Sequence, residues 1–184
     1  MATAILALQG AFAEHAAMLD RLGEPHFEIR QARDLQRPFN RLILPGGEST
    51  VMRRLLHDLD LFDALHAHIA EGMPVFGTCA GLILVAKQVD GGLPCFATMD
   101  IAVKRNAYGR QLGSFSTEEV FGTLGKLPMT FIRAPYIASV SGETESLAVV
   151  DGRIVAARQD NQLVTAFHPE LDNDPSIHEY FLSM

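Results

Sequence analysis

The sequence has few cysteines, no excess of basic residues and no apolar run long enough to cross a membrane. Two cysteines in 184 residues argue against a disulfide framework. Fifteen basic against twenty-two acidic residues give a net charge of −7 without a basic stripe, which argues against nucleic acid as a partner. No uninterrupted apolar run approaches the ~20 residues that span a bilayer, and no basic segment leads an apolar run after Met1. We therefore expect no secretory signal, no membrane partner and a cytoplasmic location.

Metal-binding motifs are also missing. The sequence holds neither Cys-x-x-Cys nor His-Glu-x-x-His. His66 and His68 lie two positions apart in a helical pattern, so their side chains face different directions. We expect His26, His57 and His178 to face solvent. The sequence therefore predicts no structural or catalytic metal.

The N-terminal half alternates strand and helix signals, and neither a repeat nor a linker divides the chain. We therefore expect residues 1–184 to form one domain. Strands that are apolar throughout, joined by helices, are typical of a parallel sheet covered on both faces. The predicted strands are residues 4–8, 27–30, 41–44 and 74–77, and the predicted helices are 12–22, 49–57, 61–71 and 80–89.

From about residue 101 onward, strand signals follow one another with few helices between them. Asp151-Gly152 predicts a tight hairpin turn, because that turn type needs a positive φ at both central residues. The strand-like segments are 101–104, 114–120, 129–132, 146–150, 153–155 and 163–167, and 177–182 reads as a terminal helix. The whole pattern predicts an α/β fold: a three-layer sandwich with a mostly parallel central sheet and antiparallel strands at one edge.

One cysteine stands where a strand is predicted to turn into a helix. Gly77-x-Cys79-x-Gly81 has the layout of a nucleophile elbow, with cysteine in the place more often held by serine. Such a turn strains the central residue and crowds its neighbours, so the flanking residues must be small. The turn would place the sulfur at a helix N-terminus, which favours the thiolate. Cys79 is therefore the predicted nucleophile, whereas Cys95 is interpreted as an incidental thiol.

A base and a carboxylate follow the last predicted strand. Residues two apart on an extended chain point to the same side, so His168 and Glu170 are expected to face one way. Pro169 restricts the backbone on both sides of it. Glu170 would accept a hydrogen bond from one imidazole nitrogen and leave the other to exchange a proton with sulfur. Together with Cys79 they make a predicted catalytic triad.

A glycine-rich loop joins the third predicted strand to its helix. Residues 45–50 read Pro-Gly-Gly-Glu-Ser-Thr; Glu48 would repel a phosphate, and the lysine of a nucleotide-binding loop is missing. Attack on an amide needs two backbone N–H groups aimed at the developing oxyanion. We predict the N–H of Ala80, directly after the nucleophile, and the N–H of Gly47 as these donors. An ordinary turn with a helix cap at Ser49 is compatible with the same residues.

These motifs resemble those of a known family. The segment around Cys79, the glycine loop and His168-Pro169-Glu170 resemble triad-type (class I) glutamine amidotransferases, which have a flavodoxin-like fold. Three further blocks are similar to the glutaminase subunits of pyridoxal 5′-phosphate synthase: Gln-Gly-Ala with Glu-His at residues 9–15, Arg-Asn-x-x-Gly-Arg-Gln at 105–111, and Phe-Ile-Arg-Ala-Pro at 131–135. With the triad motifs, these blocks extend over nearly the whole chain.

The resemblance implies hydrolysis of L-glutamine through a cysteinyl thioester, with release of glutamate and ammonia. It implies that glutamine is held by Gly47, Glu48 and Ser49, by Arg105, and by Ile132 and Arg133. Chemically, an arginine suits the substrate's carboxylate and Glu48 suits its ammonium group.

The resemblance also implies a partner. Ammonia would pass to a synthase subunit that is a (β/α)₈ barrel, in a large hetero-oligomer, while this chain itself would bind no cofactor. We hypothesise that docking reorients the Gly46–Gly47 peptide and so activates the glutaminase. Departures from the family pattern lie at Ala13, at residues 92–97 and at Ser176, none of them in the predicted triad.

Three other readings remain open on sequence grounds. The chain could be the glutaminase of another amidotransferase, such as the imidazole glycerol phosphate synthase type, or a stand-alone cysteine hydrolase of related fold. It could also be a binding module with a dead site, although the triad and both predicted oxyanion donors are present. Glutamate release from glutamine, with and without a synthase, separates these readings.

Overall fold

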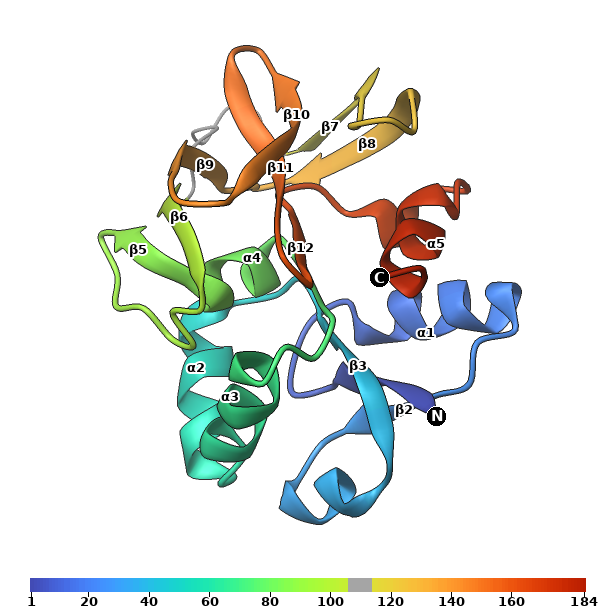
Figure 1. Ribbon diagram of the computed structural model, residues 1–184, viewed down its shortest axis with the longest axis vertical. Helices are drawn as coiled ribbons and strands as arrows, with labels where there is room; N and C mark the ends of the chain where they lie inside the picture. Colours follow the sequence, from blue (N-terminus) through green and yellow to red (C-terminus); the bar gives the residue numbers. More distant parts are fainter. Residues whose placement is uncertain (106–113) are drawn as a thin grey trace.

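The computed structural model describes residues 1–105 and 114–184. Its main feature is one long mixed sheet with strand order β2-β1-β3-β4-β12-β11-β9-β6-β5 and with β10 paired to β11 (Figure 1). The strands from β2 to β12 run parallel. Their bounds are β1 Ala2–Leu6, β2 His26–Ile29, β3 Phe39–Leu44, β4 Val75–Thr78 and β12 Gln162–Thr165.

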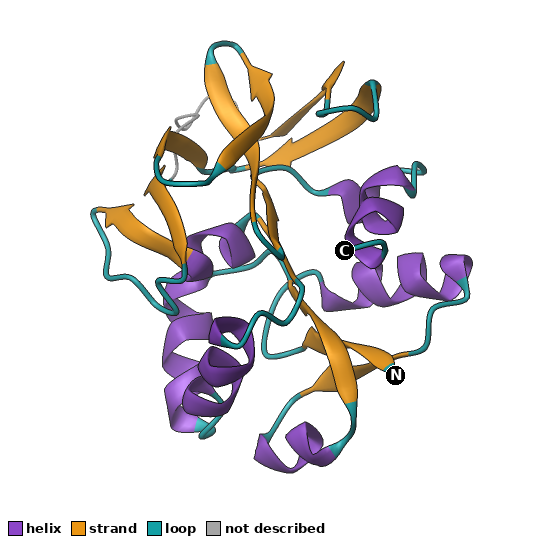
Figure 2. Ribbon diagram, viewed as in Figure 1, coloured by secondary structure: helices purple, strands orange, loops and turns teal. Residues whose placement is uncertain are grey.

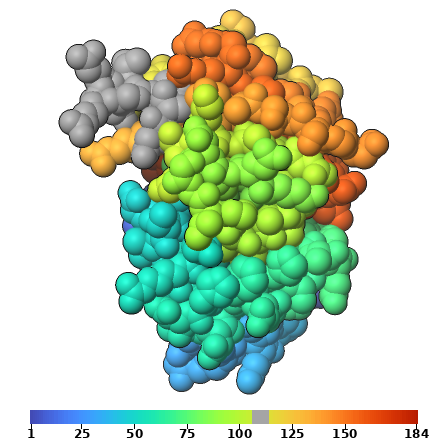
Figure 3. Space-filling model, turned by 90° about the vertical axis from the view of Figure 1, so that its left-hand side faces the viewer, coloured from blue at the N-terminus to red at the C-terminus, as the bar shows by residue number. Residues whose placement is uncertain are grey.

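Helices cover both faces of the parallel strands. Helices α2, α3 and α4 lie on one side and α1 and α5 on the other (Figure 2), and Figure 3 shows the face where α2 and α3 lie beside the β5–β6 segment. The three-layer arrangement predicted from the sequence is therefore confirmed. The helix bounds are α1 Phe12–Leu22, α2 Ser49–Asp58, α3 Phe62–Ala70, α4 Ala80–Val85 and α5 Ser176–Leu182, with short 3₁₀ turns η1 Ala32–Gln36 and η2 Pro169–Leu171.

Burial explains why the parallel strands are apolar throughout. Four of the five residues of β1 and all four of β4 are buried, because helices pack on both faces of these strands. Helix α1 ends at Gly23, whose φ of 68° is the left-handed value that closes many helices. No helix within the described part of the chain is long and apolar enough to span a membrane.

The second half of the chain extends the sheet with antiparallel strands. Strands β12, β11, β9 and β6 pair antiparallel in that order, and a separate two-stranded sheet is formed by β7 and β8. The predicted hairpin joins β10 to β11, with φ of 49° at Asp151 and 72° at Gly152. The bounds are β6 Met99–Lys104, β7 Ser114–Val120, β8 Lys126–Ile132, β9 Tyr136–Val140, β10 Glu145–Val150 and β11 Arg153–Gln159.

One secondary-structure prediction is wrong, and one strand was missed. The helix expected over residues 80–89 ends at Val85, and the chain continues as strand β5, Ala86–Asp90, which pairs parallel with β6 at the sheet edge. Burial accounts for the change, because the apolar first part is enclosed whereas Lys87 and Gln88 are exposed. Strand β9 was not predicted, since no alternating apolar pattern marks it.

Candidate active site

Cys79 occupies a strained turn between β4 and α4. Its φ of 49° and ψ of −96° fall where non-glycine residues are rare, and such strain clusters at functional sites. Its N–H donates to the carbonyl of Thr165 on the neighbouring strand β12, at 2.8 Å. A Cβ on Gly77 would lie 2.8 Å from the backbone of Gly81, and one on Gly81 would lie 1.9 Å from the carbonyl oxygen of Leu44. The predicted crowding of the elbow is therefore present.

The side chains of His168 and Glu170 are in contact with each other. The Nδ1 of His168 lies 2.7 Å from the Oε1 of Glu170, and both residues are buried. The predicted pairing is correct but its predicted cause is wrong. The chain is not extended here: His168 precedes η2, and Glu170 belongs to that 3₁₀ turn, with Pro169 at its start. The N–H of His168 donates to the carbonyl of Thr130 on β8, at 2.8 Å, which fixes the backbone of the base.

Burial and partners act in opposite directions on the base. Burial lowers the pKa of His168, but hydrogen bonds with Cys79 and Glu170 and the negative charges of both outweigh burial and raise the pKa to about 10. Burial raises the pKa of Glu170, and the hydrogen bond and charge of His168 oppose that rise. Cys79 and Glu170 therefore both favour the charged form of His168, and Glu170 is bonded to its Nδ1 at 2.7 Å.

The glycine loop lies beside these side chains. A Cβ on Gly46 would lie 2.4 Å from the Cε1 of His168 and 3.4 Å from the Cβ of Cys79, so any larger residue here would displace the imidazole. The Gly46 carbonyl accepts from the N–H of Ala11, at 3.0 Å. Because the peptide is trans, the N–H of Gly47 points away from Ala11. The alternative interpretation, a helix cap at Ser49, does not hold: Glu48 is the N-cap of α2, and its side chain makes no capping bond.

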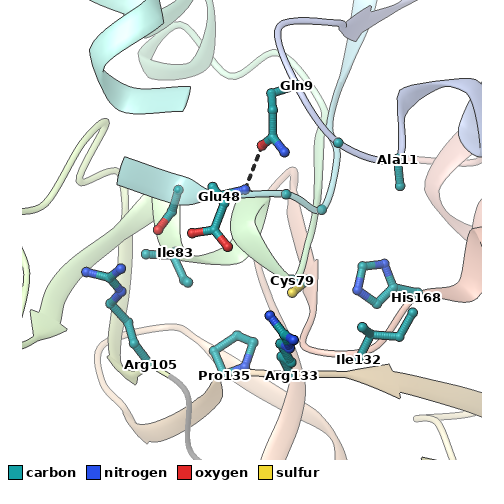
Figure 4. Close-up of a pocket in the computed structure, with 14 residues that line it drawn as sticks. Gln9, Ala11, Glu48, Cys79, Ile83, Arg105, Ile132, Arg133, Pro135 and His168 are labelled. Carbon is teal, nitrogen blue, oxygen red and sulfur yellow. Dashed lines mark hydrogen bonds between the residues drawn. The ribbon is translucent and has the colours of Figure 1, made fainter. Parts of the chain in front are cut away.

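Gln9 is a site residue whose contacts the sequence did not reveal. Its side-chain Oε1 accepts from the N–H of Glu48, at 2.7 Å (Figure 4). The same atom lies 2.5 Å from the place where a Cβ on Gly47 would stand. Gln9 therefore holds the loop from the side of strand β1. Since the loops after β1 and β3 leave the same edge of the parallel sheet, strand order was the signal that could have placed them together.

These loops enclose a cavity of about 440 Å³ at the carboxyl ends of the parallel strands. Glu48, Arg105, Arg133 and His168 surround Cys79 in it (Figure 4). Arg133 has a φ of 45°, a second strained position in the cavity wall. Of the residues predicted from the sequence, the cavity is lined by Gly47, Glu48, Ser49, Cys79, Arg105, Ile132, Arg133 and His168.

The remaining predicted residues lie elsewhere. Ala80 and Glu170 are buried next to Cys79 and His168 respectively, outside the cavity lining. The part of the predicted block from Asn106 to Gln111 lies outside the described residues. Among the residues that the structure describes, no group of three or more His, Cys, Asp and Glu side chains is placed to hold a metal ion.

Cys95 and His178 complete the outcome for the other sequence candidates. Burial raises the pKa of Cys95 to about 11, which disfavours the thiolate that a nucleophile needs. The expectation that His178 faces solvent is wrong: it is fully buried and lies 3.0 Å from the Nδ1 of His15. His57 is exposed, as expected, and His26 is half-buried.

A strained thiol backed by a buried imidazole and carboxylate, at the open edge of a parallel sheet, is the arrangement of an α/β enzyme for cysteine-based acyl transfer. Comparison with known proteins narrows this class of enzyme to one family. Residues 5–184 match the SNO glutamine amidotransferase family. The chain belongs to this family, and the resemblance inferred from its motifs is confirmed.

Curated relatives match over their full length. A pyridoxal 5′-phosphate synthase subunit PdxT of Methanocorpusculum labreanum is 58% identical over 184 residues, covering 100% of this chain and 97% of that protein. The protein of the same name from Streptococcus pneumoniae is 54% identical, covering 100% and 97%. The one from Haemophilus influenzae is 53% identical, covering 100% and 98%.

Solved structures agree with the fold. A crystal structure of a glutamine amidotransferase superimposes with a TM-score of 0.93 at 38% identity, covering 100% of this chain and 98% of that one. A putative GMP synthase subunit from Thermoplasma acidophilum superimposes with a TM-score of 0.70 at 14% identity, covering 100% and 92%, and shows a similar fold only.

Proposed function

We propose that this chain is the glutaminase subunit of a pyridoxal 5′-phosphate synthase, which hydrolyses L-glutamine to L-glutamate and ammonia. The chain's membership of a glutamine amidotransferase family and its full-length similarity to the PdxT proteins support this function. One observation carries the chemistry: Cys79 opens into the same cavity as Glu48, Arg105 and His168, and His168 is held from behind by the buried Glu170. The imidazole glycerol phosphate synthase type is not favoured, because the full-length relatives bear the other name.

In the first half of the proposed reaction, His168 takes the proton of the Cys79 thiol, and the thiolate attacks the side-chain amide carbon of glutamine. The carbonyl oxygen becomes an oxyanion, which the N–H groups of Gly47 and Ala80 would stabilise. His168 then gives its proton to the amide nitrogen, the carbon–nitrogen bond breaks and ammonia leaves. A thioester between Cys79 and the glutamyl group remains.

In the second half, water cleaves the thioester. His168, now neutral, takes a proton from the water as the hydroxyl oxygen attacks the thioester carbon. A second oxyanion forms at the same place and collapses, the carbon–sulfur bond breaks and glutamate leaves with the added hydroxyl. Glu170 holds the imidazole through the 2.7 Å contact to Nδ1 and stabilises its positive charge during both halves.

Substrate recognition rests on charges that flank the sulfur. We assign the substrate's carboxylate to Arg105 and its ammonium group to Glu48, since each offers the opposite charge within the cavity. Ser49, Ile132 and Arg133, which also line the cavity, would complete the binding wall. The chain needs no cofactor for this reaction.

The released ammonia must reach the synthase subunit without protonation in bulk water. We propose that this subunit docks over the cavity in a hetero-oligomer and that docking reorients the Gly46–Gly47 peptide. The bond from the N–H of Ala11 to the carbonyl of Gly46 holds the present orientation, so breaking it is the required first step.

We treat residues 1–184 as one functional domain, because a single sheet connects β2 at one edge with β5 at the other. We place the reaction in the cytoplasm. The proposed mechanism requires Cys79 as a free thiol, and thiols stay reduced in that compartment.

One assay tests the function: glutamate release from glutamine, by wild-type chain and by Cys79→Ala, each with and without the synthase subunit. We expect release by the wild-type chain, stimulated by the synthase subunit, and none by Cys79→Ala, although the variant still binds the synthase subunit. Equal activity of the two chains would refute the role of Cys79. Full activity toward amides or peptides without a synthase would favour the stand-alone hydrolase.

A further inference from the structure

Behind the proposed triad lies a set of buried polar side chains that the mechanism above does not use. His15 of α1, Thr78 of β4 and His178 of α5 are all 0% exposed. The Nδ1 of His15 lies 3.0 Å from the Nε2 of His178, and the Nε2 of His15 lies 3.1 Å from the hydroxyl of Thr78. The same Nε2 lies 3.5 Å from the Oε2 of Glu170. Burying polar side chains costs free energy of folding unless hydrogen bonds compensate, so we asked what this cluster does.

Proton positions in the cluster follow from its chemistry. The carboxylate of Glu170 is only an acceptor, so the His15 nitrogen that faces it is favoured as an N–H. The opposite nitrogen of His15 is then an acceptor and receives the Nε2–H of His178. This leaves the Nδ1 of His178 as an acceptor, and among the described residues it has no hydrogen-bond partner. The reverse assignment would aim a lone pair at the carboxylate and bury an unpaired donor.

Both histidines are kept neutral by their surroundings. Burial, with the nearby His178 and His168, lowers the pKa of His15 well below its usual value, and burial lowers the pKa of His178 to about 4. The hydrogen-bond partner of the Nε2 of a neutral His15 is the hydroxyl of Thr78, at 3.1 Å, and the Oε2 of Glu170 lies 3.5 Å from the same nitrogen. Among the described residues that oxygen has no hydrogen-bond partner, so the dipole of the His15 N–H acts on it without adding a charge. At 3.5 Å the contact is longer than an ordinary hydrogen bond, but the dipole acts in a buried place where screening is weak.

We propose that His15 is a positioning residue for the glutaminase reaction: it orients the free oxygen of Glu170, so that the other oxygen holds His168, and His178 fixes the tautomer of His15. This inference rests on the proposed function. It adds to the triad a second layer, Glu170–His15–His178, whose members come from η2, α1 and α5.

Few other titratable groups of the described residues face Glu170 and His168. Glu170 faces His168 from its own segment and His15 from α1, and Glu14 of α1 adds a like charge that raises the pKa of the carboxyl. His168 faces Cys79 and Glu170. Without the N–H of His15, the carboxylate of Glu170 loses a stabilising dipole and supports the charged imidazole of His168 less well.

Two substitutions of His15 test the proposal in the complex with the synthase subunit. His15→Phe removes the donor, whereas His15→Gln can place an amide N–H near the position of Nε2. For His15→Phe we expect kcat to fall about tenfold, a part of what an acid–base group contributes, with KM changed less than about twofold. We also expect the alkaline limb of the pH profile to move about 1 pH unit lower. His15→Gln should restore most of kcat and of the profile. Equal loss in both variants, or no loss in His15→Phe, would refute the proposal.

A measurement on the wild-type chain keeps the test independent of the folding of any variant. With ¹⁵N-labelled histidine, NMR should find His15 and His178 as neutral Nε2–H tautomers at neutral pH. A charged His15, or one protonated on Nδ1, would overturn the proposal. His57→Gln, at an exposed histidine of α2, serves as the control and should leave kcat and the profile unchanged. The NMR result requires no turnover, and Cys79→Ala in the same assay tests the proposed function by itself.

Discussion

A single methyl group added at Gly46 should move the imidazole of His168 away from the sulfur of Cys79. In Gly46→Ala the new Cβ would stand 2.4 Å from the Cε1 of His168, 3.0 Å from its Nδ1 and 3.4 Å from the Cβ of Cys79. Carbon atoms prefer about 3.5–4.0 Å, so the imidazole must move by about 1 Å. That movement displaces the base from the sulfur and strains the 2.7 Å contact with Glu170.

The size of the effect follows from geometry. A misplacement of about 1 Å at reacting groups costs about 100-fold in rate, or about 3 kcal/mol in the activation barrier. We therefore expect kcat/KM for glutamine hydrolysis in the synthase complex to fall about 100-fold. The new methyl group meets side chains rather than backbone, so Gly46→Ala should still fold and bind the synthase subunit.

Gly72→Ala is the matched control. Gly72 has a φ of 92° with nothing within 4 Å of a new Cβ, so the substitution should lower the free energy of unfolding by about 1 kcal/mol through backbone strain alone. Its kcat/KM should equal that of the wild-type chain. Thermal unfolding of both variants, measured beside the kinetics, separates loss of stability from loss of catalysis. A folded Gly46→Ala that keeps more than half of the wild-type kcat/KM would contradict the geometry of the site.

Three further predictions concern the triad, the elbow and acid stability. Cys79→Ala should abolish glutamine hydrolysis, and His168→Asn should lower kcat by a factor of at least about 100. Glu170→Gln should lower kcat less, because Glu170 orients the base and does not react. Equal and mild losses of kcat in all three variants would count against these roles. Gly81→Ala should lower the free energy of unfolding by about 3 kcal/mol in denaturant titration, because its Cβ would stand 1.9 Å from a backbone oxygen; an unchanged midpoint would contradict the packing. The pKa of His178, about 4 when folded, is below the unfolded value of 6.5, so its contribution is present above pH 6.5 and is lost as the pH falls toward 4, by about 3 kcal/mol. His178→Gln should weaken this dependence in melting curves, and identical curves would exclude it.

Local chemistry explains what could be predicted from the sequence. The elbow at Cys79 and the turn at Asp151–Gly152 each depend on residues that are adjacent in the chain, and both have the expected backbone. Apolar runs identified the parallel strands because burial on both faces leaves no place for polar residues. The predicted triad came from two motifs whose members are close in sequence, whereas Arg105, Ile132 and Arg133 came only from the family resemblance.

The incorrect predictions have a physical cause in common. Strand β5 continues directly from α4, and its pairing with β6 favours extended backbone where the apolar run alone suggested helix. The burial of His178 depends on His15, which is 163 positions away, and no periodicity reports such a contact. The contact of Gln9 with the glycine loop likewise depends on strand order. Tertiary contacts overrode local pattern in each case.

Helix α1 connects the two halves of the proposed catalytic machinery. Its N-cap residue, Ala11, holds the carbonyl of Gly46, and one turn later His15 faces Glu170. The loop that would supply an oxyanion donor and the carboxylate that holds the base therefore touch the same rigid element. A partner that displaces Ala11 would act on the peptide of Gly46 directly and on Glu170 through the helix. Because Ala11 and His15 lie one turn apart on α1, a partner that docks on the start of this helix would act close to both contacts.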